Sequence, residues 1–255
     1  MVPRLWLALS LAELGQFPEA VSEAERAVAE AEATEEPHTL CNAILVLGRI
    51  FLLRGQPEQA IPPLERSLSL AGAWHIGLLQ PSAPLSYAYL LAGRLAALRE
   101  LWPPPLPTRI ANSAGVMVER GECLLGLGHT EEACDFAHNA LDLARQVGER
   151  GHEARALALM ATVEARRLGV ASRRSGELHD QATARAEDLG MRPLVGRCQL
   201  YAGCRWLAMG NRARAREHLQ RAAATFHELD MACWLARAES ALGGQAGTTE
   251  ARSAP

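Results

Sequence analysis

Four arginines fall within ten positions of the segment NRARAREHLQR, namely Arg212, Arg214, Arg216 and Arg221. Such a cluster could grip a phosphate backbone, because guanidinium groups bind phosphate oxygens strongly. The net charge of the chain is −3, however, and neither stacking aromatic residues nor a groove-entering helix is evident near the cluster. Nucleic acid is therefore not the expected partner, and the solvated outer face of a helix is the simpler interpretation.

Cysteine and histidine could bind a metal or act in catalysis, but their spacing does not favour it. The six cysteines form no C-x-x-C pair, and the eight histidines form no H-E-x-x-H motif. A nucleophile, a base and an orienting group do not occur together. We therefore expect no metal, no cofactor and no catalytic activity, with the cysteines acting as small buried apolar residues.

The apolar segments of the chain are short. The longest uninterrupted runs fall far below the ~18 residues of a membrane-spanning helix, and no secretion signal opens the sequence. The sequence therefore predicts a soluble cytoplasmic protein that has no membrane partner.

The elements that would position a site come from an internal repeat. Four segments align without a gap: LAELGQFPEAVSEAERAV, FLLRGQPEQAIPPLERSL, LLGLGHTEEACDFAHNAL and WLAMGNRARAREHLQRAA. A glycine in each is expected to end one helix in the left-handed conformation, and an alanine five residues later lets two helices approach closely. The two columns are Gly15, Gly55, Gly128 and Gly210, then Ala20, Ala60, Ala133 and Ala215.

This helix-turn-helix unit resembles the tetratricopeptide repeat, whose pattern has a bulky, a small and an aromatic residue before the glycine. Leu47, Gly48 and Phe51 fill those places before Gly55. The resemblance implies an all-α fold, a right-handed α-solenoid of about six hairpins with a C-terminal capping helix. Repeats are expected near residues 1–33, 37–72, 82–102, 108–149, 150–189 and 191–229, followed by a cap at 231–242 and a disordered tail at 243–255.

A narrower resemblance lies at the C-terminal end. Residues 187–242, with the phrases LGMRPL and AREHL, are similar to the last repeat and cap of certain bacterial regulators. Those proteins join a nucleotide-cyclase or LuxR-type DNA-binding domain to an ATPase and a C-terminal repeat array, and their chemistry belongs to the upstream domains. The chain has no lysine, so it cannot contain a phosphate-binding loop of the G-x-x-x-x-G-K-S type.

Two interpretations of the beginning of the chain stay open. Met1 falls at the first position of the first repeat, so Leu5, Trp6, Leu7 and Leu9 are expected to be partly bare. A C-terminal fragment of a cyclase or ATP-binding transcriptional regulator would cover this edge with an upstream ATPase or cyclase domain. A complete small protein would instead pair through it.

By resemblance, function belongs to the concave face that the first helices line. The groove is mainly apolar and lacks the polar set of a carboxylate clamp, so a helical or apolar peptide, or another protein domain, is the predicted partner. Arg49, Arg166 and Arg197 could anchor acidic groups, while packing of some groove side chains inside the superhelix is the alternative. The face-lining positions are Asn42, Leu45, Arg49, Leu52, Val118, Glu122, Leu125, Leu159, Val163, Arg166, Arg197, Leu200, Cys204 and Leu207.

Overall fold

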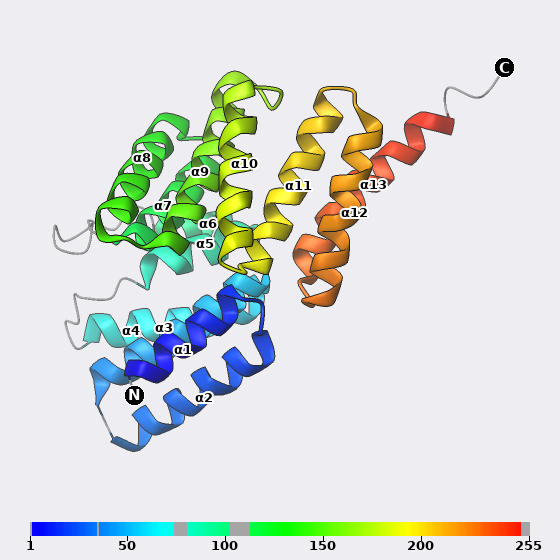
Figure 1. Ribbon diagram of the computed structural model, residues 1–255. Coiled ribbons are helices and arrows are strands. Elements are labelled where there is room, and N and C mark those ends of the chain that lie inside the picture. The colour runs from blue at the N-terminus through cyan, green and yellow to red at the C-terminus, as the bar shows by residue number, and fades with distance from the viewer. Residues whose placement is uncertain (1, 35, 74–80, 102–112, 251–255) are drawn as a thin grey trace.

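The computed structural model describes residues 2–34, 36–73, 81–101 and 113–250. Within this part of the chain every regular element is an α-helix (Figure 1), so the predicted all-α class is confirmed. The helices are α1 (Val2–Glu13), α2 (Phe17–Thr34), α3 (Pro37–Arg54), α4 (Pro57–Ala73), α5 (Ser82–Leu91), α6 (Leu95–Leu101), α7 (Ala114–Leu127), α8 (Thr130–Val147), α9 (Arg150–Leu168), α10 (Arg173–Asp188), α11 (Arg192–Ala208), α12 (Arg212–Glu228) and α13 (Ala232–Glu250).

Successive helices pair into six hairpins, from α1/α2 to α11/α12, and α13 packs on α12 as the closing helix. This arrangement is the helical-repeat solenoid that the sequence predicts. The closing helix runs to Glu250, beyond the predicted end of the cap at residue 242, so part of the segment expected to be a disordered tail is helical. Residues 251–255 of that segment lie outside the described residues.

The glycine column ends the first helix of each hairpin. Gly15, Gly55, Gly128 and Gly210 have φ of 85°, 79°, 90° and 76°, in the left-handed region where a side chain is costly. After α3, for example, the Gly55 N–H donates to the Leu52 carbonyl at 2.9 Å. The role predicted for this column is therefore confirmed.

The alanine column lies where the two helices of a hairpin meet. All four alanines are completely buried: Ala20, Ala60, Ala133 and Ala215. Glycine at the small position of the first helix brings the helices together as well, since a Cβ on Gly48 would lie 2.5 Å from Cγ of Leu64, and one on Gly203 equally close to Leu219. In these hairpins the two helices pack closely, because a small residue on one helix lies against a large side chain on the other.

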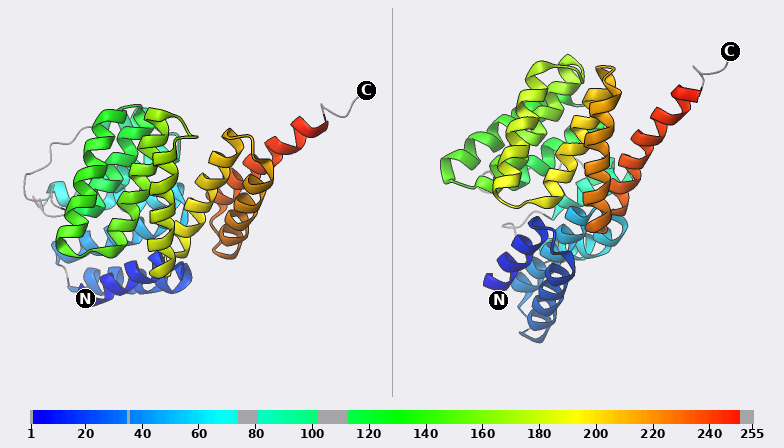
Figure 2. Two further views of the ribbon diagram at one scale, coloured as in Figure 1. Left: turned by 45° about the horizontal axis from the view of Figure 1, so that its top comes forward. Right: turned by 45° about the vertical axis from the view of Figure 1, so that its right-hand side comes forward.

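The solenoid curves until its first hairpins pack against its last helices. One hydrophobic cluster joins residues of α1, α2 and α3 with residues of α11, α12 and α13, and Figures 1 and 2 show the N-terminal hairpin beside the beginning of α11. A Cβ on Gly15 would lie 2.8 Å from the Leu229 side chain, and one on Gly55 would lie 2.6 Å from the Trp234 ring. The described helices therefore form a closed ring.

A strained residue sits at this closure. Asp230 has φ of 52°, and it is the one non-glycine residue with positive φ in the described ranges. The junctions after α8 and α10 use Gly148 and Gly190 for the same conformation. Asp tolerates the left-handed region better than most residues, and its carboxylate forms an ion pair with Arg54 at the end of α3. The left-handed junction thus carries a charge that links the two ends of the ring.

Candidate functional site

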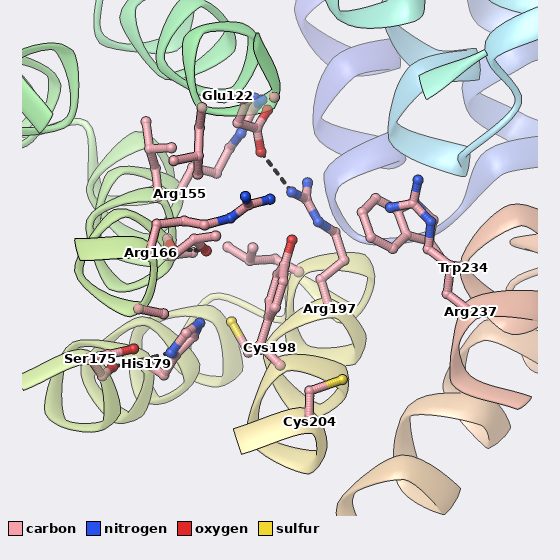
Figure 3. Close-up of a pocket in the computed structure, with 18 of the residues that line it drawn as sticks. Glu122, Arg155, Arg166, Ser175, His179, Arg197, Cys198, Cys204, Trp234 and Arg237 are labelled. Carbon is pink, nitrogen blue, oxygen red and sulfur yellow. Dashed lines mark hydrogen bonds and ion pairs between the residues drawn. The ribbon is translucent and has the colours of Figure 1, made fainter. Parts of the chain in front are cut away.

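A cavity of about 500 Å³ opens on the inner side of the ring. Its walls come from α5, α7, α9, α10, α11 and α13, and Figure 3 shows the side chains that converge on it. Its size lies within the roughly 300–1,000 Å³ of ordinary ligand pockets. We refer to this cavity as the central pocket.

One helical stripe on each of two helices forms most of the polar and apolar lining. On α9, Arg155, Leu159, Thr162 and Arg166 follow one another at spacings of three or four residues, so they share one face. On α11 the same spacing aligns residues of mixed character, namely Leu194, Arg197, Cys198, Tyr201, Cys204 and Arg205.

The central pocket is strongly basic. Five arginines line it against a single carboxylate, Glu122, and the arginines are Arg155, Arg166, Arg197, Arg205 and Arg237. Arg197 donates to Glu122 at 2.6 Å, and Arg155 lies 3.4 Å from Glu13. Within the described residues the other three arginines have no carboxylate at salt-bridge distance. The lining therefore carries uncompensated positive charge, which favours an anionic ligand.

Aromatic rings hold the pocket arginines in place. The guanidinium carbons of Arg197 and Arg237 each lie 4.7 Å from the centroid of the Trp234 ring. Cation–π contacts of this kind stabilise a partly buried charge. Trp234 also packs on Gly55 in the closure, so the same ring lines the pocket and joins the ends of the solenoid.

His179 lies in the wall of the pocket, in a column that holds alanine or leucine in other repeats. Its Nδ1 lies 3.1 Å from the Ser175 carbonyl, which can only accept, so Nδ1 carries the proton and Nε2 is left with a lone pair. The ring packs on Tyr201 with centroids 5.4 Å apart. Burial lowers the pKa of His179 to about 4, so the imidazole is neutral near pH 7.

We expect this neutral histidine to make the fold sensitive to acid. Its folded pKa of about 4 lies below the unfolded value of 6.5, so the unfolded chain binds more protons between these two pH values. Stability is then lost as pH falls through that window, by about 2 kcal/mol between pH 7 and pH 5. Urea unfolding at the two pH values measures this loss.

The control for this prediction is His179→Leu, which restores the residue type of the column. The variant should lose about 2 kcal/mol less than the parent between pH 7 and pH 5. A smaller slope should remain, because burial also lowers the pKa of His152 and of His218. An unchanged slope in the variant would show that His179 is not the group responsible.

The structure brings together only some of the residues predicted for the groove. Glu122, Leu159, Arg166 and Arg197 line the central pocket, as do Leu125 and Cys204. Others belong to the hydrophobic core, with exposed fractions between 1% and 7%: Leu45, Leu52, Val118, Val163 and Leu200.

The three remaining groove residues lie elsewhere. Arg49 donates to Glu119 at 2.9 Å, Asn42 donates to the His38 carbonyl at 3.1 Å, and Leu207 packs partly buried against the cluster that closes the ring. The curvature of the ring explains the contacts of Arg49 and Leu207, because it brings the first helices of separate repeats together. Side chains thus fill most of the concave face, and the central pocket is the part of that face where a cavity remains.

Sequence reasoning missed several residues of the pocket: Tyr87, Arg155, His179, Tyr201, Arg205, Trp234 and Arg237. Arg155 and Arg205 could have been found by extending the stripes from Arg166 and Arg197. No local signal indicates Trp234 and Arg237, since they reach the pocket from the closing helix.

The basic cluster of α12 lies on the outer surface, as predicted. Its four arginines are exposed, Arg221 pairs with Glu217 at 2.6 Å, and Arg214 lies 4.7 Å from the ring centroid of Trp206. Among the described residues, no group of three or more His, Cys, Asp or Glu side chains is placed to hold a metal ion.

Four of the six cysteines are buried thiols. Cys41, Cys123, Cys134 and Cys198 are buried, whereas Cys204 and Cys233 are partly exposed. Burial raises the pKa of the Cys198 thiol, which lines the pocket, to about 11. This thiol is therefore protonated and a poor nucleophile near pH 7.

Comparison with known proteins gives one match to a family model, the tetratricopeptide repeat, over residues 2–73. These residues form the hairpins α1/α2 and α3/α4, whose glycine and alanine columns recur along the chain. Residues 2–73 therefore form tetratricopeptide repeats. No match is found among curated proteins.

Comparison with solved structures finds a shared architecture in BtubC. BtubC (BKLC) from P. vanneervenii is 18% identical with a TM-score of 0.53, over 84% of this chain and 92% of that chain. Tetratricopeptide-like repeats of a Podosopora anserina kinesin light chain are 18% identical with a TM-score of 0.37, over 89% and 95% of the two chains. At this identity the likeness to BtubC shows the fold alone.

Tetratricopeptide repeats generally mediate protein–protein interaction, and their fold is typically a non-catalytic scaffold. The described helices include none that is both long and apolar enough to span a bilayer.

Proposed function

We propose that this chain is a non-catalytic, cytoplasmic scaffold that binds a peptide segment of a partner protein in the central pocket. The observation that carries the proposal is the pocket itself, a cavity of about 500 Å³ at the centre of a ring of tetratricopeptide-type hairpins. Peptide-binding sites combine apolar surface, which supplies affinity, with a few polar groups, which fix orientation. The central pocket has both.

The apolar part of the pocket favours side chains of intermediate size. Leu90, Leu125, Leu159 and Leu194 line it from four different helices, and Val170 lines it from the turn after α9. Leu90 and Val170 are partly or fully exposed, so an entering ligand would cover them, whereas Leu159 is buried at the base. A short apolar or helical segment fits this surface better than an extended strand, because no sheet edge exists among the described residues to pair with it.

The chemistry of the lining supports binding rather than catalysis. Cys198 is held as a thiol, and His179 is neutral, with its Nδ1 proton committed to the Ser175 carbonyl. Neither lies in a nucleophile–base–orienting arrangement. The predicted alternative, a fragment of a cyclase or ATP-binding regulator with an upstream ATPase or cyclase domain as partner, stays a prediction from the sequence.

The test is a peptide selection against the purified chain. Peptides enriched from a displayed random library should lose affinity at least about tenfold for Thr162→Trp, which fills the pocket without changing its charge. Thr162 lines the pocket, and its hydroxyl bonds only to the Ala158 carbonyl of its own helix. The matched control is Ala213→Trp, an exposed position on α12. Peptides that bind both variants as well as the parent would refute the pocket as the docking site.

A further inference from the structure

The wall of the central pocket formed by α9, α10 and α11 contains polar atoms that lack a partner. Arg197 Nε, Arg205 Nε and His179 Nε2 are buried and make no hydrogen bond within the described residues. His179 is only 5% exposed. Buried polar groups in proteins are nearly always satisfied by protein, water or ligand, so the unsatisfied nitrogens in this wall leave hydrogen-bonding capacity for a ligand group.

The chain fixes Arg205 in this wall at a cost to helix stability. Its guanidinium lies on Gly176 in α10, where an added Cβ would come within 2.4 Å of Cζ, so a larger residue there would displace the guanidinium. Gly176 lies inside a helix, where glycine is disfavoured by roughly 0.5–1 kcal/mol relative to alanine. Its φ lies outside the left-handed range, so no turn requires a glycine here. Room for the Arg205 guanidinium is the reason that the structure offers.

Carboxylates of the chain only partly balance the positive charge of this wall. Arg205 and Arg166 have no carboxylate partner in the described part of the chain, and Arg166 is exposed at the end of α9. Figure 3 shows Arg166 pointing into the pocket toward Arg197. Arg197 is the compensated member, through Glu122. An anion that enters the pocket would therefore meet lining guanidinium groups that lack a carboxylate partner, in a partly desolvated cavity where charge-assisted hydrogen bonds are strong.

His179 adds a second requirement that a ligand of this wall must meet. Because Nδ1 donates to the Ser175 carbonyl, Nε2 of the neutral ring can only accept. A ligand that satisfies the wall must offer anionic oxygens to the arginines and an N–H or O–H donor beside them. A carboxylate next to an amide N–H has this pattern, and so does a phosphate monoester that retains one proton.

We propose that Arg166, Arg205 and His179 form an anion subsite of the central pocket, which recognises a carboxylate or phosphate group on an otherwise apolar ligand. The inference rests on the proposed function, since it names the group by which a bound peptide would be anchored. It can nevertheless be tested without any peptide.

The probes are hippurate, hippuramide and phenyl phosphate. Hippurate carries a benzoyl group, an amide N–H and a carboxylate, and hippuramide is its neutral counterpart. Calorimetry should show saturable binding of hippurate, at least about tenfold weaker binding of hippuramide, and weakening of the anion by added salt. Tighter binding of phenyl phosphate than of hippurate would identify phosphate as the preferred source of charge, and the reverse order would identify carboxylate; either result supports the subsite.

The variants are Arg205→Gln and Arg166→Gln, with Arg216→Gln on the exposed face of α12 as the matched control. Each pocket variant should weaken hippurate about tenfold and leave hippuramide unchanged, whereas the control should change neither. Arg166 is exposed and lacks a salt-bridge partner, so Arg166→Gln keeps the test valid even if Arg205→Gln unfolds the chain. Equal binding of hippurate and hippuramide, or equal loss in the control, would overturn the subsite. Pocket-dependent binding of neutral peptides would then leave the proposed function standing without it.

Discussion

Trp234→Ala should lower the free energy of unfolding by about 3–5 kcal/mol, the range for removal of a buried large aromatic side chain. Trp234 is 3% exposed and packs against Gly55 across the closure, with Phe226 at 6.2 Å between ring centroids. Its removal leaves a cavity between the two ends of the ring and takes the aromatic face away from Arg197 and Arg237. Urea unfolding gives the magnitude.

Hydrogen exchange would show where this stability is lost. If the ring is closed as described, protection should fall in α1 and α3 as well as in α11 to α13, because the cluster around Trp234 includes both groups. Trp206→Ala is the control, since Trp206 is partly exposed and contacts Arg205 and Arg214 on α11 and α12. It should cost less and leave α1 unaffected. Loss of protection confined to α12 and α13 in Trp234→Ala would mean that the ends of the chain do not meet.

The second large effect is expected for Glu122→Ala, which should destabilise the fold by about 3–5 kcal/mol. Glu122 and Arg197 join α7 to α11 at 2.6 Å, and their side chains are 14% and 16% exposed. Removing the carboxylate leaves a guanidinium that is mostly buried, next to Arg155 and without its counter-charge. That uncompensated charge, rather than the lost attraction, is the source of the cost.

The matched control is Glu217→Ala, which removes the acid of the exposed pair with Arg221. These side chains are 57% and 61% exposed, so water replaces the lost partner and the change should stay below about 1 kcal/mol. The double variant Glu122→Ala/Arg197→Met should recover much of the loss, because it removes the stranded charge as well. Similar losses for Glu122→Ala and Glu217→Ala would show that the central pair is as solvated as the surface one.

The hairpins could be predicted because their signals are local. Gly55 ends α3 and Ala60 lies in the next helix, so a pattern of two residues spaced five positions apart fixes both the turn and the close contact. The same combination of a turn glycine and a buried alanine recurs at Gly15, Gly128 and Gly210. Each hairpin therefore follows from its own residues, and the all-helical fold follows from the hairpins.

The pocket could be predicted only in part, because it depends on curvature. Each hairpin is rotated slightly relative to the one before it, and over six hairpins these rotations add up to the curvature of the ring. No local sequence pattern gives this total rotation. For Leu200 and Val163 the sequence left groove lining and internal packing as alternatives, and the structure buries both: Val163 among neighbouring hairpins and Leu200 against the first hairpins across the closure. Trp234 enters the pocket from the opposite end of the chain, and its sequence neighbours resemble an ordinary capping helix. The arginine stripes of α9 and α11, in contrast, follow helical spacing and could be predicted from the sequence.

Ring closure also bears on how the chain is made. In an open solenoid each repeat contacts only its neighbours and can fold as it leaves the ribosome. Here Arg54 pairs with a residue 176 positions later, and the apolar faces of α1 and α3 wait for α11 to α13. At about 5–20 residues per second that delay is roughly 10–35 seconds. During translation the first hairpins thus expose apolar surface, which makes the nascent chain, rather than the finished ring, the form most in need of a chaperone.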